Sequence, residues 1–115
     1  MPCLNISTNV NLDAVDISSL HSDATAAVAA LLRRPEAHVM VVLKGSVSIT
    51  FGGSADPAAH AELMSVGGFS PDVNQRLSAA IAAILEAKLS VPKHRFILKF
   101  YDVKGSDCGW NGSTC

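Results

Sequence analysis

The chain has 115 residues, close to the commonest size of a single domain. Hydrophobic residues make up 49% and charged residues 17%, which excludes a disordered chain because such chains lack the apolar surface that offsets their ordering entropy. Nine basic and ten acidic residues nearly cancel and are scattered, so we expect no nucleic-acid partner. These totals predict one domain over residues 1–115.

The first half of the chain predicts a strand, a helix and a strand. Residues 3–8 are expected to form the first strand. Ser18 or Ser19 is the expected cap of a helix that ends before Pro35, and residues 39–43 form an apolar second strand. The apolar positions of the helix recur at spacings of three and four; they are Leu20, Ala24, Ala27, Val28, Leu31 and Leu32.

The second half repeats this order after one additional predicted strand, residues 47–51. A strand is expected over residues 60–65, followed by a helix with Ser70 as its cap and Pro71 in its first position, where proline is well tolerated. The last strand is expected over residues 96–100, before a loose, glycine-rich tail. The apolar stripe of the second helix comprises Val73, Leu77, Ile81, Ile84, Leu85 and Leu89.

The two halves are related by a shift of 57 residues, the separation of Pro35 and Pro92 (92 − 35). The same shift superposes the helix stripes and the flanking strands, so the chain is expected to contain two βαβ pseudo-repeats, over about residues 2–57 and 58–115. Right-handed crossovers would place both helices on one face of a four-stranded mixed sheet. An oligomer is the simplest way to cover the other face.

Three cysteines, Cys3, Cys108 and Cys115, are an odd count without Cys-x-x-Cys spacing, so we expect neither a disulfide framework nor a zinc site. The first ten residues lack the pattern of a signal peptide, and no apolar run approaches the roughly 20 residues that span a bilayer. The expectation is a reduced, cytoplasmic protein with no metal, no cofactor and no membrane segment.

Pro2 is the most informative candidate for a catalytic residue. Removal of Met1 would leave a secondary amine at the start of the first strand, beside an apolar core. An α-amino group titrates at roughly 7.7–8.0, and burial lowers this pKa toward the range in which general bases are most effective. The alternative is that proline is merely tolerated as the second residue.

Two basic positions also have alternative interpretations. Lys99 interrupts an apolar strand, so it either faces solvent or lines a pocket for an acidic ligand. Arg34, with Arg33, ends the first helix, where a cation complements the helix dipole without any ligand.

The order of several short motifs resembles the macrophage migration inhibitory factor and D-dopachrome tautomerase family, and most closely its plant members. The resemblance covers essentially the whole chain. The matching segments are the Met-Pro start with Thr8-Asn9-Val10, Phe51-Gly52-Gly53-Ser54 with Asp56-Pro57, Ser65-Val66-Gly67, Asn74, Phe100-Tyr101-Asp102 and Gly109-Trp110-Asn111-Gly112-Ser113-Thr114.

The resemblance implies a homotrimer with tautomerase activity, in which Pro2 is the general base and acid and the substrate is a small aromatic keto acid. Arg34 stands where the family has a carboxylate-binding lysine, and its guanidinium suits a carboxylate. Ser65 and Val66 match the pocket wall, and Trp110 matches a tryptophan near the site.

Three positions depart from the migration-factor pattern. Ile97 and Lys99 stand where that branch has a tyrosine and an asparagine from the neighbouring subunit, which makes the site more similar to the dopachrome-tautomerase branch. Cys115 replaces a phenylalanine. With fewer aromatic contacts, weak turnover of aryl pyruvates such as phenylpyruvate is expected. The alternative is a cytokine-like or protein-binding module with a receptor and vestigial catalysis, released without a signal peptide.

Overall fold

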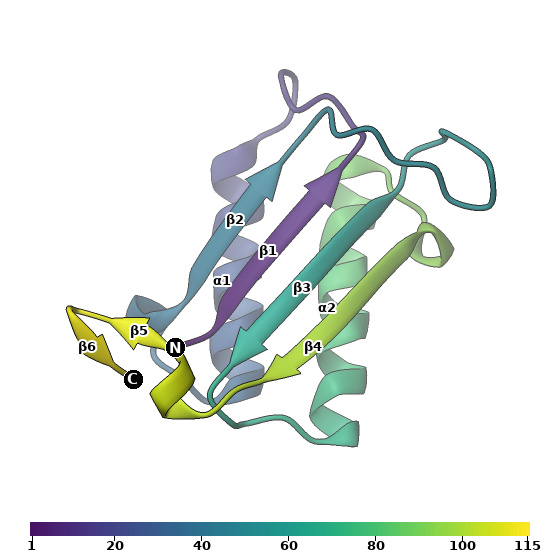
Figure 1. Ribbon diagram of the computed structural model, residues 1–115. Helices are drawn as coiled ribbons and strands as arrows, with labels where there is room; N and C mark the ends of the chain where they lie inside the picture. Colours follow the sequence, from purple (N-terminus) through teal and green to yellow (C-terminus); the bar gives the residue numbers. More distant parts are fainter.

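Four strands form one sheet, and two helices cover one of its faces (Figure 1). The computed structural model describes all residues, 1–115. The main elements are β1 (Cys3–Thr8), α1 (Ile17–Leu32), β2 (Met40–Lys44), β3 (Ala59–Ser65), α2 (Pro71–Leu89) and β4 (Phe96–Asp102). Short 3-10 turns η1 (Glu36–His38), η2 (Lys93–Arg95) and η3 (Gly105–Asp107) precede β2, β4 and a terminal hairpin of β5 (Gly109–Trp110) and β6 (Ser113–Thr114).

The strand order is β2-β1-β3-β4, with β1 antiparallel to β3 at the centre and a parallel partner on each side. Each parallel pair is joined through a helix, because parallel strands need a long crossover. The predicted four-stranded mixed sheet of two βαβ units is confirmed. Neither helix has the length and apolar character needed to cross a bilayer.

Residues that are 57 positions apart in the two βαβ units occupy equivalent places in the packed structure, as the sequence pattern predicts. Leu20 and Leu77, its equivalent, are both fully buried between the helices and the sheet, and so are Val28 and Leu85. The helices even end alike: the equivalent residues Arg33 and Ser90 both cap their helix in the left-handed conformation, with φ of 55° and 57°. One hydrophobic core therefore lies between the sheet and both helices.

The second helix begins as predicted, but the first begins earlier. The Ser70 hydroxyl accepts a hydrogen bond from the Val73 amide at 3.1 Å, which caps α2. The expected cap of α1 at Ser18 or Ser19 is wrong, because the Asp16 carboxylate accepts from the Ser19 amide at 3.0 Å and places Asp16 at the cap. An aspartate there also complements the positive end of the helix dipole.

The strand predicted over residues 47–51 is not formed. The Val47 amide donates to the carbonyl of Thr8, the last residue of β1, at 3.0 Å, but this pairing goes no further, and the rest of the segment has only a single bridge between Phe51 and Ser54. The loop is held instead by Arg95, whose guanidinium donates to the carbonyl oxygens of Phe51, Ser54, Asp56 and Pro57 at 3.0–3.1 Å.

The tail is a hairpin rather than a loose segment. Asn111 and Gly112 have φ of 54° and 75°, as a two-residue type I′ hairpin turn requires. This turn pairs Gly109 with Thr114 and brings Cys108 opposite Cys115, with Cα atoms 5.4 Å apart. The two cysteines form a disulfide, so the expectation of a fully reduced chain is wrong here.

The face of the sheet away from the helices is not covered by any element of this chain (Figure 1). Side chains alternate along each strand, so Leu98 and Phe100 of β4 pack toward the core while Ile97, Lys99 and Tyr101 point to the open face. Large apolar side chains remain exposed here: 53% of Ile97 and, on β2, 61% of Met40.

Candidate active site

An apolar cavity of about 280 Å³ opens where β1 begins and β3 ends. Parallel β2 starts at the same end of the sheet, and the terminal hairpin lies beside the amino terminus there (Figure 1). Eight of the eleven lining residues are hydrophobic. The lining comprises Met1, Pro2, Cys3, Ala37, His38, Val39, Met40, Met64, Cys108, Gly109 and Trp110.

Pro2 is buried and is one of the residues that line this cavity. Its carbonyl oxygen accepts a hydrogen bond from the Met40 amide at 3.0 Å, which extends the β1–β2 pairing by one residue and fixes the backbone. The Pro2 nitrogen is joined to Met1, which also lines the cavity. Loss of Met1 would therefore both free this nitrogen and enlarge the cavity around it.

Two rings stand on one side of the cavity. His38, the last residue of η1, and Trp110 of the hairpin lie 5.9 Å apart between ring centroids, tilted by 54°. Both are cavity-lining residues, and 53% of Trp110 is exposed. Trp110 therefore lines the same cavity as Pro2, and His38 adds a second flat wall.

Arg34, Ser65 and Val66 form a neighbouring cluster outside the cavity lining. The Arg34 guanidinium donates to the carbonyl oxygens of Leu32 and Val66, both at 3.1 Å. The buried Ser65 hydroxyl donates to the Gly67 carbonyl at 2.9 Å. Within one chain, the polar atoms of this cluster form hydrogen bonds that stabilise the turn after β3. Met64, near the end of β3, lines the cavity.

Ile97 and Lys99 lie farther away, on the open face of the edge strand β4. The Lys99 ammonium is 5.1 Å from the centroid of the Tyr101 ring, and neither residue lines the cavity. The neighbouring strand β3 does reach the cavity through Met64, but a single chain leaves Ile97 and Lys99 of β4 outside its own cavity.

His38 and Cys108 are lining residues that sequence reasoning missed. His38 carries no motif, and its place depends on a turn whose end meets the hairpin. A signal for Cys108 does exist. Asn111-Gly112 is a strong hairpin dipeptide, and counting outward equally from it leads to Cys108 and Cys115.

The third cysteine, Cys3, is a free thiol in the same cavity. Burial raises the pKa of this thiol, because an apolar environment disfavours the charged thiolate. Thiols react with alkylating agents as thiolates. Cys3 should therefore be a poor nucleophile despite its place beside Pro2.

We expect iodoacetamide to modify Cys3 of the unreduced folded protein at neutral pH more slowly than it modifies free cysteine. Intact mass recorded over time measures the rate, and urea-unfolded protein provides the reference. The variant Cys3→Ala identifies the labelled thiol. A folded-state rate equal to the unfolded-state rate would contradict the predicted protection.

The chain is similar to known proteins along its whole length. Residues 1–115 match the family model described as macrophage migration inhibitory factor (MIF). The macrophage migration inhibitory factor homolog of Trichinella spiralis is 38% identical over 115 residues, which cover 99% of each chain. The Xenopus laevis macrophage migration inhibitory factor is 32% identical over 114 residues, covering 99% of this chain and 98% of that one.

Solved structures agree with the sequences. The crystal structure of a macrophage migration inhibitory factor homologue from Prochlorococcus marinus matches with a TM-score of 0.93 at 34% identity, covering 97% of both chains. The structure of the Trichinella spiralis factor matches with a TM-score of 0.92 at 36% identity, covering 98% of this chain and 99% of the other. With the model match over every residue, these results show that the chain belongs to the macrophage migration inhibitory factor family.

Proposed function

We propose that this protein is a keto–enol tautomerase in which Pro2, freed of Met1, is the general base and acid. Membership of the family supports a tautomerase-like function in general. The observation that carries the specific proposal is that Pro2 is buried and lines an apolar cavity of about 280 Å³. Apolar surroundings disfavour a charged amine and so favour its proton-accepting form.

In the reaction, the amine takes a proton from the carbon beside a ketone and returns one to the resulting enolate oxygen, or runs these steps in reverse. The net change is one hydrogen moved from carbon to oxygen. The reaction is redox-neutral, so no electron acceptor is needed.

The substrate class is an aryl pyruvate, with D-dopachrome methyl ester as an artificial substrate of the same site. The His38 and Trp110 rings offer flat surfaces for an aromatic group. Arg34 is the proposed partner of the carboxylate, assisted by Ser65 and Val66 of the adjoining turn. Because its guanidinium already donates to two carbonyl oxygens, a substrate would have to share or replace those bonds.

A homotrimer completes this proposal. The open sheet face exposes apolar side chains, Met40 and Ile97 among them, and a second copy of the chain would cover them. In such a trimer Ile97 and Lys99 reach the cavity of a neighbouring subunit. An aliphatic and a basic residue there make the proposed site more similar to the D-dopachrome tautomerase branch than to the migration-factor branch. The proposed similarity to plant members of the family rests on the sequence motifs alone.

The test is turnover of phenylpyruvate and D-dopachrome methyl ester by purified protein whose amino terminus and oligomeric state are known from intact mass and light scattering. We expect slow but measurable tautomerisation by a trimer that begins at Pro2. A correctly processed trimer that turns over neither substrate would exclude the aryl tautomerase.

Replacing Arg34 separates carboxylate binding from a structural role. Arg34→Ala should raise KM about tenfold and change kcat little, the size of one lost charge-assisted hydrogen bond. Arg34→Lys keeps the charge and should retain most of the affinity. If Arg34→Ala instead lowers the melting temperature while KM is unchanged, the guanidinium serves only the turn that it bonds to.

A second candidate is a cytokine-like or protein-binding module with residual catalysis. It is favoured by one observation: of the site residues predicted from the sequence, only Pro2 and Trp110 line the cavity of a single chain. The Cys108–Cys115 disulfide favours export by a non-classical route over a cytoplasmic location, because disulfides persist in oxidising compartments. A partner that still binds Pro2→Gly would support this function.

A further inference from the structure

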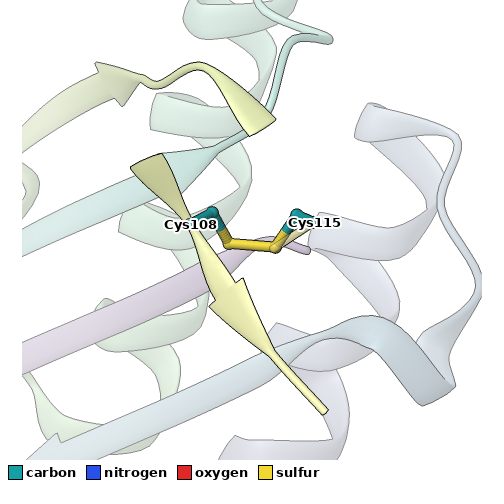
Figure 2. The surroundings of a disulfide bond; sticks show 2 residues. All are labelled: Cys108 and Cys115. Carbon is teal, nitrogen blue, oxygen red and sulfur yellow. A yellow bond between two sulfur atoms is a disulfide. The ribbon is translucent and has the colours of Figure 1, made fainter. Parts of the chain in front are cut away.

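The disulfide lies at the wall of the Pro2 cavity. Figure 2 shows the Cys108–Cys115 bond at the base of the terminal hairpin. Cys108 is 7% exposed and is itself a cavity-lining residue, together with Gly109 and Trp110, which follow it. The bond therefore fixes the segment that forms one side of the cavity.

Little else holds the hairpin in place. Its two strands have two residues each, and an isolated hairpin of this kind is marginal in water. Every residue from Gly109 to Cys115 is exposed, so no apolar core anchors the segment. Beyond its own ladder, the hairpin gains the Cys115 amide bond to the Cys108 carbonyl at 2.8 Å, the Trp110 ring against His38 and close packing of the Cys115 main chain against Gly105 of η3.

The two cysteines differ in access. Cys115 is exposed and Cys108 is buried, so an external dithiol is expected to attack the Cys115 sulfur. Cys108 then leaves as a thiolate and takes up a proton. The second thiol of the reagent resolves the mixed disulfide, so two electrons pass from the dithiol to the protein and the reagent becomes a disulfide. Cys3 shares the cavity, but its raised pKa makes it a weak competitor for exchange.

We propose that Cys108–Cys115 is a redox-modification site that controls the wall of the Pro2 cavity. In the oxidised protein the bond holds Trp110 against His38 and keeps the cavity narrow. Reduction by a dithiol releases the hairpin, separates the two rings and opens the cavity on that side. The structural part of this proposal stands without catalysis, and its kinetic consequence rests on the proposed tautomerase function.

The structural part is tested with two readouts that do not depend on activity. Iodoacetamide labelling after unfolding in urea should count one thiol before treatment with dithiothreitol and three after it. Trp110 is the only tryptophan of the chain, so its fluorescence reports on the hairpin directly. Reduction should shift its emission to longer wavelength and increase quenching by acrylamide. Three labelled thiols without treatment, or reduction with unchanged fluorescence, would overturn the proposal.

The kinetic part compares oxidised and reduced enzyme with phenylpyruvate. Reduction should raise KM about fivefold and leave kcat within about twofold, because one aromatic contact is lost while Pro2 is untouched. Equal KM values for the two forms would exclude control of the cavity. If neither form has activity, the proposed function fails, and the fluorescence still decides whether the bond holds the hairpin.

Matched variants assign the response to this bond. Cys115→Ser, at an exposed position, should behave as the reduced protein and ignore dithiothreitol. Cys108→Ser provides a second variant at the buried partner. Cys3→Ala should keep the full fluorescence response to reduction, since Cys3 is free. A response that survives in Cys115→Ser, or disappears in Cys3→Ala, would overturn the assignment.

Discussion

Pro2→Gly is expected to lower kcat for phenylpyruvate by at least about a hundredfold, the lower end of what a positioned acid–base group contributes. The proline ring is buried and its carbonyl is bonded to the Met40 amide, so the ring nitrogen has a fixed place in the cavity. Glycine keeps an amine but loses the ring that orients it, and a displaced base loses much of its effect. The measurement is a steady-state assay with the amino terminus of each protein established by intact mass.

A second variant separates the amine from the ring. One alanine inserted between Met1 and Pro2 leaves the ring in the chain but turns its nitrogen into an amide, which cannot accept the proton. This variant should be as inactive as Pro2→Gly. Glu86→Ala alters an exposed side chain of α2 that lines neither cavity of the chain and is the control that keeps wild-type turnover. If either amino-terminal variant retains activity within about twofold of wild type, another group is the base.

Leu63→Ala should destabilise the protein by about 3 kcal/mol, within the range of roughly 2–5 kcal/mol for large-to-small core substitutions. Leu63 is fully buried on the central strand β3 and lies opposite Leu4 of β1, where both helices cover the sheet. The cost combines lost burial with the cavity left behind, since the surrounding core collapses only in part. Urea unfolding followed by circular dichroism, at one fixed protein concentration, gives the free energy.

Ile17→Ala is the matched control, because Ile17 is apolar but 40% exposed at the start of α1. It should cost less than about 1 kcal/mol, as surface substitutions usually do. Equal losses for the two variants would mean that the core between helices and sheet does not dominate the stability of this fold.

Patterns that act within one element were the predictable part of the fold. Ser70 caps α2 as expected because a cap needs only the first turn that follows it. The apolar stripes were also sound guides, since residues such as Leu20 and Leu77 must face the core wherever the helix is placed. The shift of 57 residues extended this local information to the arrangement of the two βαβ units.

The secondary-structure predictions were wrong where the structure of a segment depends on contact with another segment of the chain. Residues 47–51 have the composition of a strand, but a strand is stable only when it pairs along its length, and here pairing with β1 stops at the bond from the Val47 amide to the Thr8 carbonyl. The cap of α1 was misplaced because two serines and Asp16 could all serve, and only the path of the preceding loop selects Asp16. The tail was predicted to be loose because an odd number of cysteines indicates no pairing, whereas the Asn111-Gly112 turn between Cys108 and Cys115 is what brings these two together.

The sequence by itself determined the two helices, the four strands of the main sheet and the register of the two halves, because periodicity and pairing of apolar positions are properties of residues and their near neighbours. It also singled out Pro2 as the candidate base, from the chemistry of a secondary amine. Only the tertiary structure decided what surrounds Pro2. It brought His38 and Trp110 together, turned Arg34 toward the Val66 carbonyl, left Lys99 on the open face and joined Cys108 to Cys115. Most of these placements depend on contacts between segments far apart along the chain, which no local pattern specifies. The disulfide is the exception, because it joins residues seven apart across a turn that Asn111-Gly112 indicates.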